Sequence, residues 1–180
     1  MIVTETALPG VRIIEPKVHG DPRGFFMETF QAKRYAEIAG IDLPFVQDNH
    51  SRSARGVLRG LHAQKQRPQG KLVRCARGEV FDVAVDIDPA SPTFGTWVGV
   101  VLSDVNQRQF WVPPGYAHGF VVLSDIADFE YKCTDYYDPS DEIGLIWNDP
   151  DVAIDWPIKE PLLSAKDQAL PTLAELRAAR

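Results

Sequence analysis

A single histidine, His62, lies in the middle of a strongly basic segment of the chain. The segment from His50 to Arg77 contains eight basic residues and no Asp or Glu, although the whole chain has a net charge of −6. An imidazole in a positive local field is suited to base chemistry on an anionic small molecule. A solvated basic face with an incidental histidine would show the same pattern, so the segment alone leaves both interpretations open. The eight residues are Arg52, Arg55, Arg59, Lys65, Arg67, Lys71, Arg74 and Arg77.

The size and composition of the chain narrow its class. A length of 180 residues is typical of one domain, and 44% hydrophobic with 24% charged residues is usual for a soluble globular protein. No apolar run is long enough to span a bilayer, and the N-terminus lacks the pattern of a secretory signal. Cys75 and Cys133 lie in apolar stretches, which favours reduced, buried thiols. We therefore expect a cytoplasmic protein that binds no membrane and, being acidic, no nucleic acid.

Short apolar segments separated by Gly, Pro and Asp turns predict a chain that is mostly β-structure. Their spacing is typical of a sandwich or barrel. We expect one short helix over 31–39, closed by Gly40, and a second over 173–179. The Pro- and Asp-rich stretch 137–164 should be irregular and should cover the domain. The predicted strands are 71–76, 80–87, 96–102, 107–112, 119–123 and 127–134.

Two of these segments predict a hairpin, because only Arg77-Gly78-Glu79 separates 71–76 from 80–87. A turn centred on Arg77 and Gly78 would place Lys71 and Asp82 on one mostly apolar, inward face, close enough to pair. A lysine and a carboxylate inside a small β-barrel suggest a ligand pocket, with a structural ion pair as the alternative. The argument depends on the register, since a slip of one residue would reverse the faces.

The run Pro113-Pro114-Gly115-Tyr116-Ala117-His118-Gly119-Phe120 resembles the second motif of the cupins, which are jelly-roll β-barrels. The first motif of metal-binding cupins has two histidines separated by one residue, followed by a glutamate. Here the matching stretch is His62-Ala63-Gln64-Lys65, so Gln64 replaces the second histidine. A metal site needs several converging imidazoles or carboxylates. We therefore expect an all-β, cupin-type jelly-roll β-barrel (a double-stranded β-helix) with short peripheral helices, no metal, and His62 free for proton transfer.

Runs along most of the chain resemble the dTDP-4-dehydrorhamnose 3,5-epimerase family. The match is specific to the family but less specific to double epimerisation, because relatives invert only one carbon. The runs are 21–28 (DPRGFFME), 46–51 (VQDNHS), 56–62 (GVLRGLH), 69–73 (QGKLV), 78–86 (GEVFDVAVD), 113–120 (PPGYAHGF), 131–132 (YK), 135–137 (DYY) and 164–167 (SAKD).

The resemblance implies a homodimeric jelly-roll enzyme that uses no cofactor. Such an enzyme inverts C3 and C5 of dTDP-4-dehydro-6-deoxy-D-glucose and gives dTDP-4-dehydro-L-rhamnose, in dTDP-L-rhamnose biosynthesis. On this basis residues 1–180 form a single epimerase domain with an N-terminal dimer-contact segment and a C-terminal extension. The first alternative is an enzyme of the same fold that inverts only C3 or only C5 of a related dTDP-4-keto-6-deoxy sugar.

The resemblance also implies catalytic roles. His62 would be the general base and Asp167 its partner, since a carboxylate on one ring nitrogen fixes the tautomer and supports the imidazolium. Tyr131 would deliver a proton to the opposite face of the sugar, as inversion demands. Lys71 would stabilise the enolate oxygen at C4. His118 would be a secondary contact near that oxygen or the ring hydroxyls, with a turn histidine that bonds the backbone as its alternative.

Further residues match substrate contacts of the family. Arg59 and Arg23 suit a pyrophosphate, through forked, charge-assisted hydrogen bonds. Gln47 and Asn49 are one residue apart, so on an extended segment they point the same way and could bond base or sugar edges. The complete set of expected contacts is Arg23, Phe26, Glu28, Gln47, Asn49, Arg59, His118, Glu142 and Lys166.

Phe26 has two possible roles, stacking on thymine or packing in the core beside Phe25. In the family the N-terminal stretch reaches the site of the partner subunit, so Arg23, Phe26 and Glu28 would act in trans. Two further classes share the fold, namely a non-catalytic sugar-binding cupin and a metal-dependent cupin oxygenase. The joint presence of the four expected catalytic residues argues against the first, and the missing first-motif ligands argue against the second.

Overall fold

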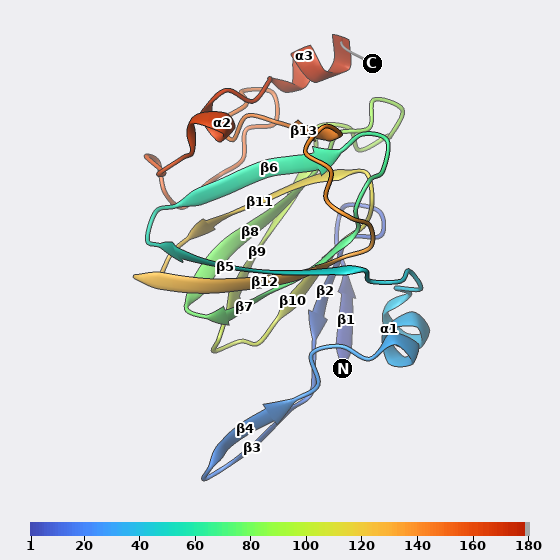
Figure 1. Ribbon diagram of the computed structural model, residues 1–180, viewed down its shortest axis with the longest axis vertical. Helices are drawn as coiled ribbons and strands as arrows, with labels where there is room; N and C mark the ends of the chain where they lie inside the picture. Colours follow the sequence, from blue (N-terminus) through green and yellow to red (C-terminus); the bar gives the residue numbers. More distant parts are fainter. Residues whose placement is uncertain (179–180) are drawn as a thin grey trace.

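The computed structural model describes residues 1–178 and consists of two facing β-sheets with short helices at the periphery (Figure 1). The six-stranded sheet has the order β1 (Ile2–Glu5), β2 (Arg12–Glu15), β10 (Gln109–Val112), β7 (Lys71–Arg77), β12 (Ile126–Cys133) and β5 (Gln47–Ala54). The five-stranded sheet has the order β13 (Glu142–Gly144), β6 (Leu58–Gln64), β11 (Tyr116–Val122), β8 (Glu79–Asp86) and β9 (Trp97–Ser103). The remaining elements are the hairpin of β3 (Val18–Asp21) and β4 (Gly24–Met27), and the helices α1 (Ala32–Ala39), α2 (Ala165–Gln168) and α3 (Leu173–Ala178).

From β5 onward the chain alternates between the two sheets, except that β8 and β9 follow each other in the five-stranded sheet. Strands β5, β7, β10 and β12 belong to the six-stranded sheet, whereas β6, β8, β9, β11 and β13 belong to the five-stranded one. Neighbouring strands in both sheets are antiparallel. This path is that of a cupin-type jelly roll, and it confirms the all-β fold expected from the sequence.

The hairpin predicted from 71–76 and 80–87 is wrong. β7 pairs with β10 and β12, while β8 pairs with β9 and β11, so the two strands lie in opposite sheets. Gly78 carries the chain from one sheet to the other at a φ of 79°, where a Cβ atom would clash with the backbone of Ile126. The predicted inward face is nevertheless correct, since Lys71 and Asp82 are both buried. Side-chain alternation decides the face whatever the pairing partner is.

Three buried clusters hold these layers together. The central cluster fills the space between the sheets and includes Phe110 and Phe129. A second cluster lies on the outer face of the five-stranded sheet, where Leu145 and Trp156 of the irregular stretch cover it. A third packs α1 against the six-stranded sheet through Tyr35, whose hydroxyl donates to Gln109 Oε1 at 2.7 Å. The prediction that 137–164 serves as cover is therefore confirmed.

The helices agree with part of the predictions. α1 begins after Gln31, whose side chain caps it, and ends at Ala39, followed by the C-cap residue Gly40, whose φ of 62° suits a glycine. α3 begins at Leu173 as expected, and residue 179 of that prediction lies outside the described residues. The strands β1 to β6 were not predicted, nor were α2 and β13, which lies inside the stretch predicted to be irregular. None of the helices within residues 1–178 is long and apolar enough to cross a membrane.

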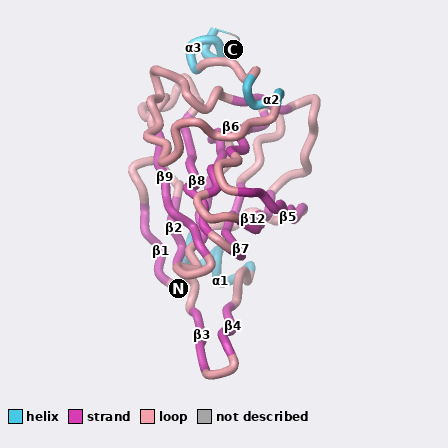
Figure 2. Tube along the Cα trace, turned by 90° about the vertical axis from the view of Figure 1, so that its left-hand side faces the viewer, coloured by secondary structure: helices cyan, strands magenta, loops and turns pink. Residues whose placement is uncertain are grey.

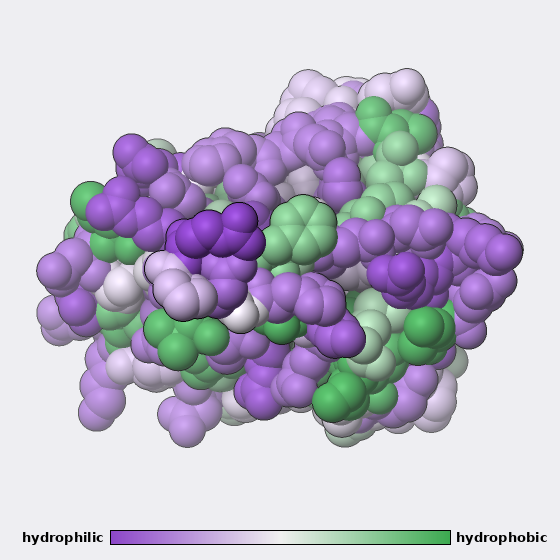
Figure 3. All heavy atoms as spheres, turned by 90° about the horizontal axis from the view of Figure 1, so that it is seen from below, coloured by the Kyte–Doolittle hydropathy of each residue, from purple (hydrophilic) through white to green (hydrophobic). Residues whose placement is uncertain are grey.

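The hairpin of β3 and β4 projects from the body of the molecule (Figures 1 and 2). In the described part of the chain its two strands pair only with each other. It carries two exposed aromatic side chains, Phe25 at 62% and Phe26 at 72% exposure. Figure 3 looks onto this end of the molecule and shows hydrophobic patches between hydrophilic ones. The alternative that Phe26 packs in the core is therefore wrong.

Candidate active site

A cavity of about 530 Å³ between the two sheets collects most of the predicted site residues. Strands from both sheets and the short helix α2 contribute to its wall. Part of the wall is apolar, with Phe120 and Phe129 among its residues. A cavity with mixed apolar and charged walls is typical of a site for a polar small molecule. The predicted residues that line it are Arg59, His62, Lys71, His118, Tyr131, Lys166 and Asp167.

Only some of the basic residues in the segment 50–77 remain unpaired in the structure. Arg59 and Lys71 line the cavity and form no ion pair with any residue between 1 and 178. The cavity therefore holds two of the segment's unpaired cations, and the other two, Lys65 and Arg77, are exposed on the surface. Four of the eight basic residues are instead neutralised by carboxylates: Arg52 by Asp128, Arg55 by Asp125, Arg67 by Asp135 and Arg74 by Glu130.

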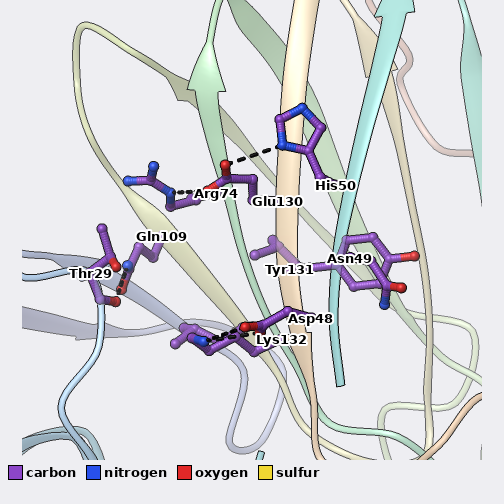
Figure 4. A pocket seen from close by; sticks show the side chains of 11 residues that line it. Thr29, Asp48, Asn49, His50, Arg74, Gln109, Glu130, Tyr131 and Lys132 are labelled. Carbon is purple, nitrogen blue, oxygen red and sulfur yellow. Dashed lines mark hydrogen bonds and ion pairs between the residues drawn. The ribbon is translucent and has the colours of Figure 1, made fainter. Parts of the chain in front are cut away.

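A second hollow, of about 380 Å³, lies on the outer face of the six-stranded sheet (Figure 4). Asn49 and Tyr131 lie on β5 and β12 next to charged residues of this hollow, but alternation turns these two side chains toward the interior. Because the charges of the outer hollow neutralise one another, the interior cavity is the better candidate site. The charged pairs of the outer hollow are Arg74–Glu130, His50–Glu130 and Lys132–Asp48.

His62 and Asp167 form a hydrogen-bonded pair in the cavity wall. His62 Nε2 lies 2.7 Å from Asp167 Oδ1. The Asp167 side chain is 6% exposed and the His62 ring is 32% exposed, so the carboxylate is shielded while the ring remains open to the cavity. A proton held on Nε2 by the carboxylate leaves Nδ1 unprotonated. This arrangement suits a general base whose imidazolium form is stabilised by a fixed anion.

The position of Asp167 follows from the short helix α2. Ser164 is the N-cap residue, and its Oγ accepts a hydrogen bond from the Asp167 amide at 3.1 Å. Burial raises the pKa of Asp167, but the hydrogen bond and charge of His62 and the Gly60 amide lower it, and the net result is a lowered pKa. Asp167 is therefore ionised at neutral pH. The Ser-x-x-Asp spacing is a helix-start signature that could have predicted α2 from the sequence.

Lys71 is a buried cation beside this pair, with 9% exposure. Its Nζ donates to the backbone carbonyl of His62 at 3.3 Å, and an ammonium has two further N–H groups to offer. Burial lowers the pKa of Lys71, and nearby acidic groups, among them Asp82 and Glu142, oppose the effect. The alternative of a structural ion pair between Lys71 and Asp82 is not formed, and Asp82 is hydrogen-bonded to His118 Nε2 instead.

Tyr131 faces the same cavity from the other sheet. It lies on β12 in the six-stranded sheet, whereas His62 lies on β6 in the five-stranded sheet. Burial raises the pKa of the Tyr131 phenol, so it remains protonated at neutral pH. A ring bound between the two sheets would therefore have a base on one face and a proton donor on the other.

A second chamber of about 270 Å³ adjoins the first, and both are lined by His62, Lys71 and Tyr131. Gln47 and Asn49 line this chamber from β5, and Gln47 Nε2 donates to Asn49 Oδ1 at 3.1 Å. The prediction that these two side chains point the same way is confirmed.

Glu142 connects the second chamber to helix α2. Its Oε1 lies 2.7 Å from Lys166 Nζ, and its Oε2 accepts a hydrogen bond from the Tyr137 hydroxyl at 2.6 Å. The Tyr137 amide also donates to Gln47 Oε1 at 2.9 Å. Tyr137 was not among the expected site residues, although it belongs to the run 135–137 that carried the family resemblance. The structure thus adds one aromatic residue to the chamber wall.

His118 lies directly opposite His62, on β11. Its ring is buried, and its Nε2 lies 2.8 Å from Asp82 Oδ1, so the alternative of a turn histidine bonded to the backbone is wrong. Strands β6 and β11 approach closely here, because a Cβ atom on Gly60 would lie only 2.6 Å from Gly119 Cα. Glycine at this point lets the two strands bring both imidazoles to one cavity.

Gln64, which takes the place of the second cupin histidine, has its amide engaged by loops. Its Nε2 donates to the carbonyl oxygens of Arg67 at 2.7 Å and Tyr136 at 3.2 Å, and its Oε1 accepts from the Asp138 amide at 2.8 Å. Gln64 thus fixes the edge of the second chamber. Across residues 1–178, no three His, Cys, Asp or Glu side chains are grouped as metal ligands would be.

Three predicted residues lie away from the cavity. Arg23 and Phe26 are on the projecting hairpin, where the Arg23 side chain is 89% exposed and pairs with Asp21. Glu28 forms an ion pair with Arg34 of α1. A chain cannot bring these residues to its own cavity without moving the hairpin.

Comparison with known proteins relates the chain to nucleotide-sugar epimerases. Residues 5–175 match the dTDP-4-dehydrorhamnose 3,5-epimerase family. An enzyme of that name from Salmonella typhimurium is 59% identical over 175 residues, which cover 96% of either chain. A dTDP-4-dehydrorhamnose 3-epimerase from Streptomyces niveus is 45% identical over 171 residues, covering 94% of this chain and 83% of its own.

The fold comparison agrees with the sequence comparison. The crystal structure of a dTDP-6-deoxy-D-glucose-3,5-epimerase from Legionella pneumophila, in complex with dTDP-4-keto-L-rhamnose, matches with a TM-score of 0.93. The two sequences are 59% identical, and the match covers 97% of this chain and 96% of the other.

Proposed function

Because this chain belongs to the dTDP-4-dehydrorhamnose 3,5-epimerase family, we propose that it inverts both C3 and C5 of dTDP-4-dehydro-6-deoxy-D-glucose. The product is dTDP-4-dehydro-L-rhamnose, in dTDP-L-rhamnose biosynthesis. One observation carries the proposal: the His62–Asp167 pair and the Tyr131 phenol face one cavity from opposite sheets. Inversion at carbon needs this placement of a base and an acid on opposite faces of the sugar.

The proposed reaction starts with proton removal next to the C4 ketone. C3 and C5 both flank this ketone, so loss of either proton gives an enolate with its charge on the C4 oxygen. His62 takes the proton, and the ionised Asp167 stabilises the imidazolium that results. Lys71 lies where the two chambers meet, and its ammonium stabilises the enolate oxygen. The sequence of proton transfers is redox-neutral and needs no electron carrier.

The nucleotide end of the substrate is bound by the remaining cavity residues. Arg59 Nε donates to Ser53 Oγ at 3.0 Å, which orients the guanidinium and leaves its terminal nitrogens for a phosphate. Gln47 and Asn49 present amides on one side of β5 for sugar or base edges. Lys166, held by Glu142, supplies a further cation beside the catalytic carboxylate.

Tyr131→Phe is expected to separate deprotonation from inversion. The substitution removes only the hydroxyl, so packing should hardly change, and His62 can still remove a proton and return one to the same face. Solvent deuterium should therefore enter the substrate at C3 and C5 in D2O, while formation of epimerised product falls by roughly 10² or more. NMR of the sugar carbons measures exchange and product together. Equal loss of both would assign Tyr131 to substrate positioning instead.

A single-centre epimerase is the second candidate, because a 3-epimerase is 45% identical to this chain over 171 residues. The same NMR experiment with the wild-type protein decides between the two. Deuterium at C3 and C5 together with an inverted product supports double epimerisation. Deuterium at only one carbon identifies the single-centre reaction, and no deuterium at either carbon rules out both.

We further propose that the chain acts as one epimerase domain in a homodimer, with the β3–β4 hairpin completing the partner's site. The hairpin projects into solvent with two exposed phenylalanines, which is unfavourable for a lone chain. It also carries Arg23, a cation suited to binding a pyrophosphate. Arg23 does not line the cavity of its own chain. The C-terminal extension, in contrast, supplies Lys166 and Asp167 to the chain's own cavity.

Mixed dimers test whether the β3–β4 hairpin acts in the site of the partner subunit. His62→Ala has an intact hairpin and an inactive cavity, whereas Arg23→Glu has an intact cavity and a repulsive hairpin. If the hairpin acts in trans, co-expression of the two with different tags should restore one site in each mixed dimer, or up to roughly a quarter of wild-type kcat/KM in a statistical mixture. Light scattering on each variant checks that dimers form. A fully active Arg23→Glu variant, or mixed dimers without activity, would contradict the proposal.

A further inference from the structure

Asp82 is a fully buried carboxylate in the middle of β8, with 0% exposure. Its two oxygens lie 2.8 and 3.1 Å from His118 Nε2. Apolar residues of the central cluster lie beside it, Ala84 on the same strand and Phe120 opposite it on β11, and the buried Lys71 is the other cation whose charge acts on it. A buried carboxylate is unfavourable unless it is paired, and an apolar residue of similar size usually packs at least as well. Packing therefore does not explain why an aspartate occupies this position.

His118 connects this carboxylate to the cavity. Its ring lines the cavity and packs nearly parallel to Phe129, with ring centroids 6.2 Å apart. Asp82 engages Nε2, and Nδ1 has no hydrogen-bond partner among residues 1–178. Nε2 is thus held by Asp82, while Nδ1 is available to a ligand in the cavity.

The proton between Asp82 and His118 can follow the charge in the cavity. Burial raises the pKa of Asp82, and the charge and hydrogen bond of His118 and the charge of Lys71 oppose this only in part, so the proton of the Asp82–His118 hydrogen bond can lie on either partner. Negative charge that develops in the cavity favours that proton on the imidazole. The doubly protonated ring would then donate Nε2–H to Asp82 and Nδ1–H to the ligand.

We propose that Asp82 is a positioning residue for the epimerisation: it orients His118 and keeps it able to carry a proton, so that His118 and Lys71 together stabilise the enolate oxygen. The proposal rests on the proposed function, because it assigns the developing charge to an enolate. The site then contains two His–carboxylate pairs with opposite tasks. The His62–Asp167 pair accepts the proton taken from carbon. The His118–Asp82 pair donates a hydrogen bond from the His118 ring to the enolate oxygen, and this hydrogen bond is lost when the carbon is reprotonated.

A double-mutant cycle tests whether Asp82 acts through His118. Asp82→Asn keeps the shape but removes the charge, and it should lower kcat roughly 10- to 100-fold while KM changes little. In a His118→Gln background the same substitution should have almost no further effect on kcat, because both substitutions disrupt the same Asp82–His118 interaction. A purely structural role would lower kcat equally in both backgrounds. A wild-type kcat in Asp82→Asn, or an undiminished loss in the His118→Gln background, overturns the proposal.

Asp86→Asn is the matched control. Asp86 is a buried carboxylate on the same strand, but it accepts hydrogen bonds from the Ser91 and Thr93 hydroxyls at 2.5 and 2.6 Å and is not among the residues of the cavity wall. The control should lose thermal stability and keep its kcat. Thermal midpoints recorded for all variants separate misfolding from lost catalysis.

A spectroscopic measurement needs neither turnover nor a variant. In the NMR spectrum of the wild-type protein, a strongly deshielded proton should bridge His118 Nε2 and Asp82, and Nδ1 should carry the second ring proton. The absence of a bridging proton, or an unprotonated Nδ1, overturns the proposal even if Asp82→Asn does not fold. If the wild-type protein epimerised no dTDP sugar, the proposed function would fail, and this spectrum would still decide whether Asp82 orients the ring.

Discussion

His62→Ala is expected to lower kcat by roughly 10² to 10⁴ while the variant still folds and binds dTDP. The imidazole is the base with an ionised partner 2.7 Å away, whereas the second histidine of the cavity, His118, is buried and is assigned to the enolate oxygen. The measurement is proton exchange at C3 and C5 in D2O, together with a calorimetric titration with dTDP. Exchange at the wild-type rate would show that another group is the base.

Two further variants make this result interpretable. In His62→Ala the buried Asp167 loses the partner that lowers its pKa, so the thermal midpoint should fall; His62→Asn keeps a donor for the carboxylate and should be more stable but equally inactive. His50→Ala is the control for a histidine outside the cavity, since His50 lies on the outer face of the six-stranded sheet. It should retain wild-type exchange.

Lys71→Met is expected to reduce kcat by roughly 10² to 10³ with little change in dTDP binding. The charge that Lys71 stabilises develops mainly on the way to the enolate, so its loss affects the transition state more than the bound substrate. Turnover and a calorimetric titration with dTDP, measured side by side, test this separation. Strongly weakened dTDP binding with near-normal saturated turnover would assign Lys71 to the pyrophosphate.

Arg59→Met is the matched control, because it removes the other unpaired cation of the cavity. It should raise KM and weaken dTDP binding with a smaller effect on kcat.

The stability of the two variants should also differ. Folding lowers the pKa of Lys71, which means that the folded state holds this proton less tightly and that the charge opposes folding at neutral pH. Lys71→Met should therefore fold at least as stably as the wild type, so its inactivity cannot be ascribed to unfolding.

The sequence by itself was sufficient for the fold class and for most of the site. Alternating polarity depends only on which face of a strand is buried, so it placed Lys71 and Asp82 in the interior correctly even though the strand pairing was wrong. The same rule put Gln47 and Asn49 on one side of β5. The family-like runs predicted which residues line the cavity, and their proposed roles remain to be tested by the variants above.

Only the tertiary structure decided which groups meet. His62 and Asp167 are 105 positions apart in the chain, and α2, which carries Asp167, is too short to be predicted with its orientation. The structure also showed that Asp82 pairs with His118, that four arginines of the basic segment are neutralised by carboxylates elsewhere in the chain, and that the hairpin with Arg23 leaves the body of the molecule. Strand pairing and charge pairing are mostly non-local, because from β5 onward this jelly roll sends most consecutive strands to opposite sheets. Local patterns therefore determine the face of each residue, and the fold determines its partner.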